Sequence, residues 1–133
     1  MSLDSVQWIY DAAHSGKIGK RPRMSKQLAN LLDAYMLVHP FVHLHHLGTV
    51  GDERHKKESP TSYHLHEPPD AIDITSIGPY DLSDLEQRME VATQFAAIGG
   101  VCYHAHNGKR GHLHVQTPGR YAGKYRSGEV HLT

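Results

Sequence analysis

Apolar side chains recur at helical spacing in the segment that follows Ser25. Five of them fall at the i, i+3, i+4, i+7 and i+8 positions of one helix face: Leu28, Leu31, Leu32, Tyr35 and Met36. Ser25 is a favourable N-cap residue, and Pro40 cannot continue a helix because it lacks an N–H group. The pattern therefore predicts a helix between these two residues, with its apolar face in the core.

A shorter helix is expected near the N-terminus. Asp4 or Ser5 can cap it, and it would run to about His14, because Gly16 then provides a stop signal. The basic stretch 17–23 contains Gly and Pro, which indicates a solvated loop between this helix and the next.

A third helix is expected after Ser83. Ser83 and Glu86 have the spacing of a capping box, in which each side chain accepts the other residue's backbone N–H. The glycines at 99–100 end this helix. The positions expected to face the core are Leu85, Met89, Ala92 and Ala96.

Four segments have the character of strands. Residues 41–50 and 71–75 are rich in apolar and β-branched side chains and are bounded by Gly or Pro. Residues 101–104 and 112–116 follow the third helix, and the Asn-Gly pair at 107–108 predicts a turn between them.

The order of these elements predicts an α+β fold: a central antiparallel sheet with helices packed mainly on one side. A chain of 133 residues is expected to form a single domain spanning 1–133. Its last part, 118–133, is Gly-rich and basic with little periodicity, so an irregular tail is expected there.

Charge and composition narrow the classes of function. Lys plus Arg and Asp plus Glu each number 14, so the formal charge is zero and a nucleic-acid partner is not expected. Cys102 is the single cysteine, which excludes a disulfide framework. No membrane insertion is expected, since the sequence has neither a long apolar run nor a signal peptide. The protein would therefore stay in the cytoplasm, leave by another route, or have lost a leader.

Histidine is the over-represented residue type, with 13 copies, and it is the commonest metal ligand. Asp73 lies between two isoleucines, so alternation places its carboxylate on the other strand face, where it needs a partner or a metal ion. His112 and His114 share one face of their strand. With a histidine of the segment 62–66, these residues could supply three ligands of a catalytic zinc site and a proton-transfer group.

Each residue also has an ordinary structural explanation. A buried aspartate is often a hydrogen-bond anchor, and two histidines on a strand are often surface residues. The combination of residues from separate strands is what favours a metal centre.

Two stretches resemble a known motif pair. Residues 62–65 (SYHL) and 71–74 (AIDI), followed by 112–114 (HLH), resemble the SxHxxGxAxD and HxH motifs of zinc D-alanyl-D-alanine carboxypeptidases and murein endopeptidases. These enzymes share a superfamily with the hedgehog signalling domain. The similarity covers roughly residues 41–117, and the glycine of the motif is missing.

The resemblance implies a hedgehog/DD-peptidase-like fold with Zn²⁺ bound by His64, Asp73 and His114. The family spacing from histidine to aspartate would instead select His66, because two residues are inserted here relative to the motif. Keeping Ser62 in register selects His64, so His66 stays open as the alternative first ligand.

The resemblance also implies an activity: a zinc metallopeptidase that hydrolyses an amide bond in peptidoglycan peptides, as a carboxypeptidase or an endopeptidase. No acidic residue directly precedes His114, so His112 would transfer the proton or stabilise the transition state. His104 or His106 lies where several members place another catalytic residue. Arg54 is a candidate for holding a substrate carboxylate.

Two other functions remain open from the sequence. Residues 111–116 (GHLHVQ) resemble the HxHxQ signature of histidine-triad nucleotidyl transferases, in which His114 would attack a phosphate and Asp73 would have no role. The missing acidic base also allows a zinc-stabilised binding module that cleaves nothing.

Overall fold

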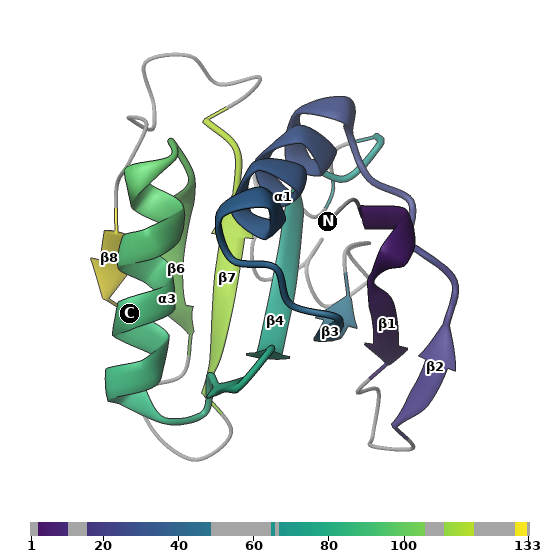
Figure 1. The fold of residues 1–133 in the computed structure, drawn as a ribbon. Coiled ribbons are helices and arrows are strands. Elements are labelled where there is room, and N and C mark those ends of the chain that lie inside the picture. Colours follow the sequence, from purple (N-terminus) through teal and green to yellow (C-terminus); the bar gives the residue numbers. More distant parts are fainter. Residues whose placement is uncertain are drawn as a thin grey trace.

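Two helices lie against the same face of one sheet (Figure 1). The computed structural model describes residues 3–10, 16–48, 65, 67–105, 111–118 and 130–132. Its elements are the 3-10 helix η1 (Leu3–Ser5), β1 (Gln7–Tyr10), β2 (Lys17–Gly19), α1 (Lys26–Val38), β3 (His43–Gly48), β4 (Ala71–Ile77), β5 (Tyr80–Asp81), α3 (Leu85–Ala97), β6 (Val101–Ala105), β7 (His112–Gln116) and β8 (Val130–Leu132).

The strands form a mixed sheet in the order β2-β1-β3-β4-β7-β6-β8, with β5 paired to β4. Its central strands, β3, β4, β7 and β6, are antiparallel to one another, as the sequence predicts. Two pairings are parallel, β1 with β3 and β8 with β6. The α+β class is therefore confirmed, and the wholly antiparallel sheet is corrected to a mixed one.

Helix α1 matches its prediction. The side chain of Ser25 accepts the backbone N–H of Leu28 at 3.1 Å and so caps the helix. At the other end the N–H of His39 donates to the carbonyl of Tyr35 at 2.8 Å. The five residues of the predicted apolar face are all buried. Local periodicity and capping chemistry therefore suffice to define this helix.

Helix α3 is present, but its cap lies one residue later than predicted. Asp84 is the N-cap, and its carboxylate accepts the N–H of Gln87 at 3.0 Å. Ser83 instead hydrogen-bonds the carboxylate of Asp81, through both its N–H and its hydroxyl. A carboxylate at the N-cap also interacts favourably with the helix dipole, which favours Asp84 over the hydroxyl of Ser83.

The buried face of α3 also differs from the prediction. Leu85 and Met89 are each 48% exposed, and the buried residues are Arg88, Val91, Ala92 and Phe95. Phe95 stacks on Tyr35 of α1, with ring centroids 4.0 Å apart and planes inclined by 13°. Ala92 is buried as predicted. Burying the aromatic pair removes more apolar surface from water than burying the small side chain of Ala96, so the buried face is rotated toward Phe95.

The expected N-terminal helix is wrong. After the short helix η1, residues 7–10 form a strand that pairs with both β2 and β3, with Trp8 opposite Gly19 and Leu44. Aromatic and β-branched residues favour a strand here, and pairing with a neighbouring sheet overrides the local capping signal. Residues 17–19, expected in a loop, form β2.

The tail is likewise not wholly irregular, since residues 130–132 add a strand beside β6. Residues 11–15, the predicted turn at 107–108 and residues 119–129 lie outside the described part of the chain.

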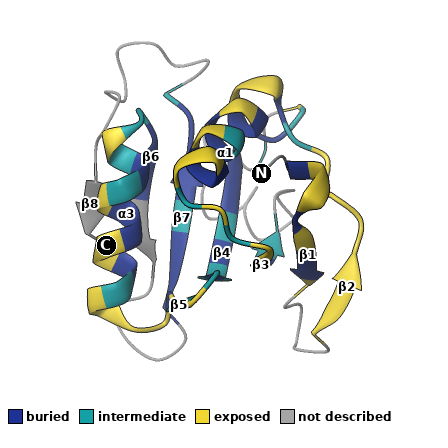
Figure 2. Cartoon of the chain, in the orientation of Figure 1, coloured by how far each residue is buried: buried dark blue, intermediate teal, exposed yellow. Residues whose placement is uncertain are grey.

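The core lies between the helices and the sheet. Ile72 and Ile74 of β4, with Leu113 and Val115 of β7, are fully buried in the same cluster as the apolar residues of α1 and α3. Figure 2 shows β4 and β7 as predominantly buried strands in the middle of the sheet. Their alternate residues therefore face away from the helices. None of the helices described is both long enough and apolar enough to cross a membrane.

Candidate metal centre

Asp73 and His114 are direct neighbours on the sheet face that points away from the helices. Asp73 lies opposite His114 in the antiparallel register of β4 and β7, between the core-facing pairs of this ladder. Directly opposed residues have their Cβ atoms about 5 Å apart, so short polar side chains can meet. The sequence predicted this face for both residues, and the structure places both on it.

The two side chains are in contact. Nδ1 of His114 lies 3.2 Å from Oδ1 of Asp73, and Nε2 of His112 lies 3.7 Å from Oδ2 of the same carboxylate. The side chains of Asp73, His112 and His114 are 14%, 11% and 15% exposed. One carboxylate thus meets two imidazoles at a site that is largely shielded from water, where charge interactions are stronger than at the surface.

Gln116 contacts the other side of the His114 ring. Its amide oxygen Oε1 lies 2.6 Å from Nε2 of His114. An amide oxygen only accepts hydrogen bonds, so this contact requires a proton on Nε2. A neutral imidazole carries one N–H, so its Nδ1 then presents a lone pair to the carboxylate of Asp73. Two electron-pair donors that face each other at this distance need a cation, either a proton or a metal ion.

The donor set fits zinc as far as the structure describes it. Imidazole nitrogen and carboxylate oxygen are both ordinary zinc ligands, and two such atoms bound to one tetrahedral ion at about 2.0–2.2 Å lie roughly 3.3 Å apart. Nδ1 of His114 and Oδ1 of Asp73 are 3.2 Å apart. Within the described residues, no group of three His, Cys, Asp or Glu side chains could hold a metal ion. A zinc site here would need a third ligand from residues outside the described ranges.

Both candidates for that third ligand, His64 and His66, lie outside the described residues. Arg54 and His106, expected to bind substrate or to assist catalysis, lie outside them as well. The backbone of His104 is described, and the register pairs this residue with Leu113 rather than with a histidine of β7. The predicted ligands Asp73 and His114 and the predicted proton-transfer residue His112 are therefore the ones that the described structure brings together.

Two polar residues of this region were missed by the sequence reasoning. Gln116 is one: the sequence placed it in the HxHxQ pattern but gave it no role beside the metal ligands, although it lies two residues after His114, on the same strand face. Ser76 is the other: its hydroxyl lies 2.7 Å from Nδ1 of His45, opposite it on β3. A register shift between β3 and β4 follows His45, so alternation along β4 alone could not have placed Ser76.

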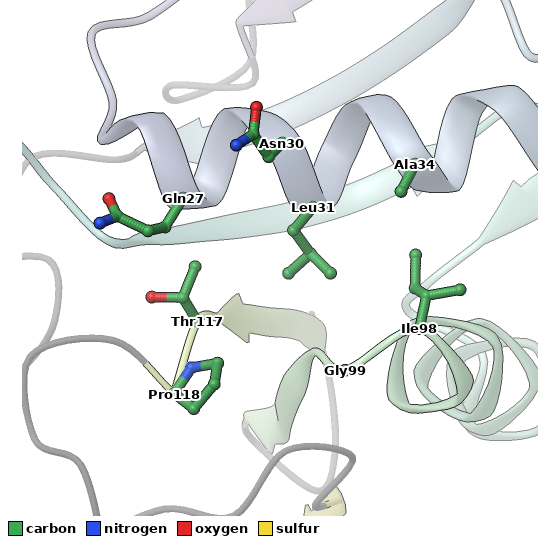
Figure 3. Close-up of a pocket in the computed structure, with 8 residues that line it drawn as sticks. All are labelled: Gln27, Asn30, Leu31, Ala34, Ile98, Gly99, Thr117 and Pro118. Atoms are coloured by element: carbon green, nitrogen blue, oxygen red, sulfur yellow. The ribbon is translucent and has the colours of Figure 1, made fainter.

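A pocket of about 390 Å³ opens on the helix side of the sheet, between α1 and the ends of α3 and β7 (Figure 3). Its lining residues are Gln27, Asn30, Leu31, Ala34, Ile98, Gly99, Thr117 and Pro118. None of these side chains ionises or is a usual metal ligand. The candidate side chains Asp73, His112 and His114 lie on the opposite face of the sheet.

His46 and Cys102 are two of the buried groups outside the candidate site whose pKa values are shifted. His46 is 1% exposed, between the rings of Trp8 and Tyr10, and its ring nitrogens have no hydrogen-bond partner among the described residues. Burial, and then the nearby charge of His45, lower the pKa of His46. Burial raises the pKa of the Cys102 thiol to about 12. Both shifts favour the neutral form of the group in the core.

Comparison of the chain with protein-family models, with curated proteins and with solved structures finds no match.

Proposed function

We propose that the chain is a zinc-dependent hydrolase that cleaves an amide bond in peptidoglycan peptides. The observation that supports this most directly is the contact between Nδ1 of His114 and Oδ1 of Asp73 at 3.2 Å, with His112 beside the same carboxylate. The motifs at 62–65, 71–74 and 112–114 resemble those of zinc D-alanyl-D-alanine carboxypeptidases and murein endopeptidases. The substrate class rests on that resemblance alone.

In this proposal Asp73 and His114 hold the metal, together with His64 or His66. When bound, Zn²⁺ supplies Lewis-acid chemistry, which polarises a carbonyl group and makes water a stronger nucleophile at neutral pH. Asp73 contributes one negative charge, so a site with two neutral imidazoles keeps a net positive charge that favours a carbonyl oxygen as it becomes negative.

His112 is proposed to move the proton. Its Nε2 lies 3.7 Å from Oδ2 of Asp73, whereas His114 contacts the other oxygen of this carboxylate, Oδ1. As a neutral base it takes a proton from the attacking water, and as an imidazolium it returns that proton to the leaving amine nitrogen. Oδ2 of Asp73 stabilises the imidazolium form of His112 by its charge.

The contacts of His114 weigh against the histidine-triad alternative. A nucleophilic imidazole needs one nitrogen directed at the substrate, but Asp73 contacts Nδ1 of His114 and Gln116 contacts Nε2. The non-catalytic binding module has the same ligands as the proposed enzyme, so only an assay of cleavage separates the two.

The test is cleavage of purified muropeptides by the zinc-loaded chain, followed by mass spectrometry. The wild type should release an amino acid or a shorter peptide, and His114→Ala should lower the rate at least about 100-fold, because a ligand is lost. His43→Ala is the matched control, since His43 is exposed on β3. Cleavage that survives His114→Ala contradicts the mechanism, and zinc binding without any cleavage favours the binding module.

A further inference from the structure

Gln116 is a buried polar residue next to the proposed metal ligands. It is 3% exposed at the end of β7, where the register pairs it with Ala71 and Val101. Its amide oxygen contacts Nε2 of His114, whereas its amide nitrogen has no hydrogen-bond partner among the described residues. A buried amide with one unsatisfied end destabilises the fold relative to an apolar side chain. The buried amide of Gln116 is therefore a candidate for a functional role at His114.

The contact determines which nitrogen of His114 can bind a cation. In the Nε2–H tautomer, Oε1 of Gln116 accepts the proton of Nε2 and the lone pair of the ring is on Nδ1, the nitrogen that faces Asp73. A histidine that binds a metal through one nitrogen commonly donates its other N–H to an acceptor, which fixes both the tautomer and the ring orientation. The arrangement of Gln116 matches this pattern.

We propose that Gln116 is a positioning residue that holds His114 as the Nε2–H tautomer and directs Nδ1 toward a Zn²⁺ ion shared with Asp73. This inference rests on the proposed function, because it presupposes the metal. An amide oxygen performs this role without adding charge, so Asp73 remains the only carboxylate in contact with the imidazoles of β7 among the described residues.

The first test compares zinc affinities by competition with a chelator of known affinity. Gln116→Met keeps the length of the side chain and removes the acceptor, so zinc affinity should fall about 10- to 100-fold. Gln116→Glu restores an acceptor and should bind zinc at least as tightly as the wild type. Thr117→Val is the matched control: its neighbouring hydroxyl is buried without a partner among the described residues, so zinc affinity should not change.

A second test needs no variant of Gln116. In the zinc-loaded wild type, long-range ¹H–¹⁵N correlation spectra should show His114 with its proton on Nε2 and the metal on Nδ1, with His114→Gln used to assign the signals. Zinc bound through Nε2 of His114 overturns the inference, because Oε1 of Gln116 then has no proton to accept.

The outcomes separate this inference from the proposed function. Equal zinc affinities of wild type and Gln116→Met overturn the role of Gln116 and leave the hydrolase intact. A wild type that binds no zinc overturns the proposed function and this inference with it. A weaker Gln116→Met, with affinity rescued by Gln116→Glu and a melting temperature like that of the wild type, supports the inference.

Discussion

Asp73 and His114 meet across two central strands, with Oδ1 and Nδ1 3.2 Å apart, although 41 positions separate them in the chain. Their backbones are fixed by the ladder between β4 and β7, and their neighbours on the other face are fully buried isoleucine, leucine and valine. Substitutions of the polar side chains should therefore change the chemistry of the site more than the stability of the sheet.

Asp73→Asn is expected to weaken zinc binding by more than about 100-fold. Changing a residue that only orients a metal ligand typically lowers metal affinity by about 10- to 100-fold, and losing a proposed ligand should lower it further. The amide has the shape of the carboxylate but lacks its charge, so a ligand is replaced by a much weaker donor. Isothermal titration with Zn²⁺ measures the effect. Asp4→Asn changes an exposed aspartate and should bind like the wild type. Tight binding by Asp73→Asn would remove Asp73 from the ligand set.

The stability of the fold should decline in mild acid because of His46. Burial lowers the pKa of His46 in the folded state below its usual value of about 6.5 in the unfolded chain. The unfolded state therefore binds the proton first, and stability is present above that value and lost as the pH falls below it, by at most about 1.4 kcal/mol per pH unit.

Urea titrations at pH 7.5 and pH 5 measure this loss. His46→Leu removes the titrating group and should show a smaller decrease in the free energy of unfolding, whereas His43→Leu, at an exposed position, should behave like the wild type. An equal decrease in all three proteins would mean that other groups cause the acid sensitivity.

Cys102 should resist alkylation while the chain is folded. It is fully buried, and burial raises the pKa of its thiol to about 12, so almost no reactive thiolate is present at pH 8. Mass spectrometry after iodoacetamide treatment should find the native protein unmodified and the guanidinium-unfolded protein carrying one adduct. Because the folded pKa is raised, the neutral thiol's contribution to stability holds below the unfolded pKa and is lost as the pH rises above it.

Thr117→Val is expected to raise the free energy of unfolding by about 1 kcal/mol. The hydroxyl of Thr117 is buried with no hydrogen-bond partner among the described residues, and valine has the same shape without the polar atom. Thr93→Val is the matched control, since its hydroxyl donates to the carbonyl of Met89 on an exposed helix surface. A destabilised Thr117→Val would indicate that the hydroxyl has a partner, such as ordered water.

The orientation of α3 predicts unequal effects of truncating its apolar residues. Phe95→Ala should cost about 3–5 kcal/mol, because it removes the ring stacked on Tyr35 and leaves a cavity. Met89→Ala should change stability by less than about 0.5 kcal/mol, since Met89 is 48% exposed. Thermal or urea unfolding measures both, and a large effect of Met89→Ala would contradict this orientation.

The sequence correctly predicted the elements that depend on nearby residues, through capping and hydrophobic periodicity. Ser25 and the apolar periodicity after it define α1, and alternation around Asp73 and His114 assigns their faces correctly. It failed where pairing between distant segments decides: residues 7–10 follow a capping signal at Asp4 or Ser5 but become a strand because β3 lies beside them. The face of α3 was also set by a distant partner, the ring of Tyr35.

For the candidate site, the sequence identified the residues that could bind a metal ion, but it did not identify the neighbouring side chains that contact them. Asp73, His112 and His114 stood out because charged or imidazole groups on apolar strands need partners. Gln116 was noted only as part of the HxHxQ pattern, and its contact with the ring of His114 is visible only in the structure. Whether His64 or His66 completes the set depends on a stretch outside the described residues.

The position of β7 in the sheet determines when the site can exist during synthesis. This strand lies between β4 and β6, so it completes the middle of the sheet after both have already left the ribosome. A nascent chain that ends before residue 112 carries the aspartate without its histidine partner. If the proposed zinc site is correct, the metal can be bound there only after residues 112–116 have been synthesised, and a fragment that ends before residue 112 should not bind it.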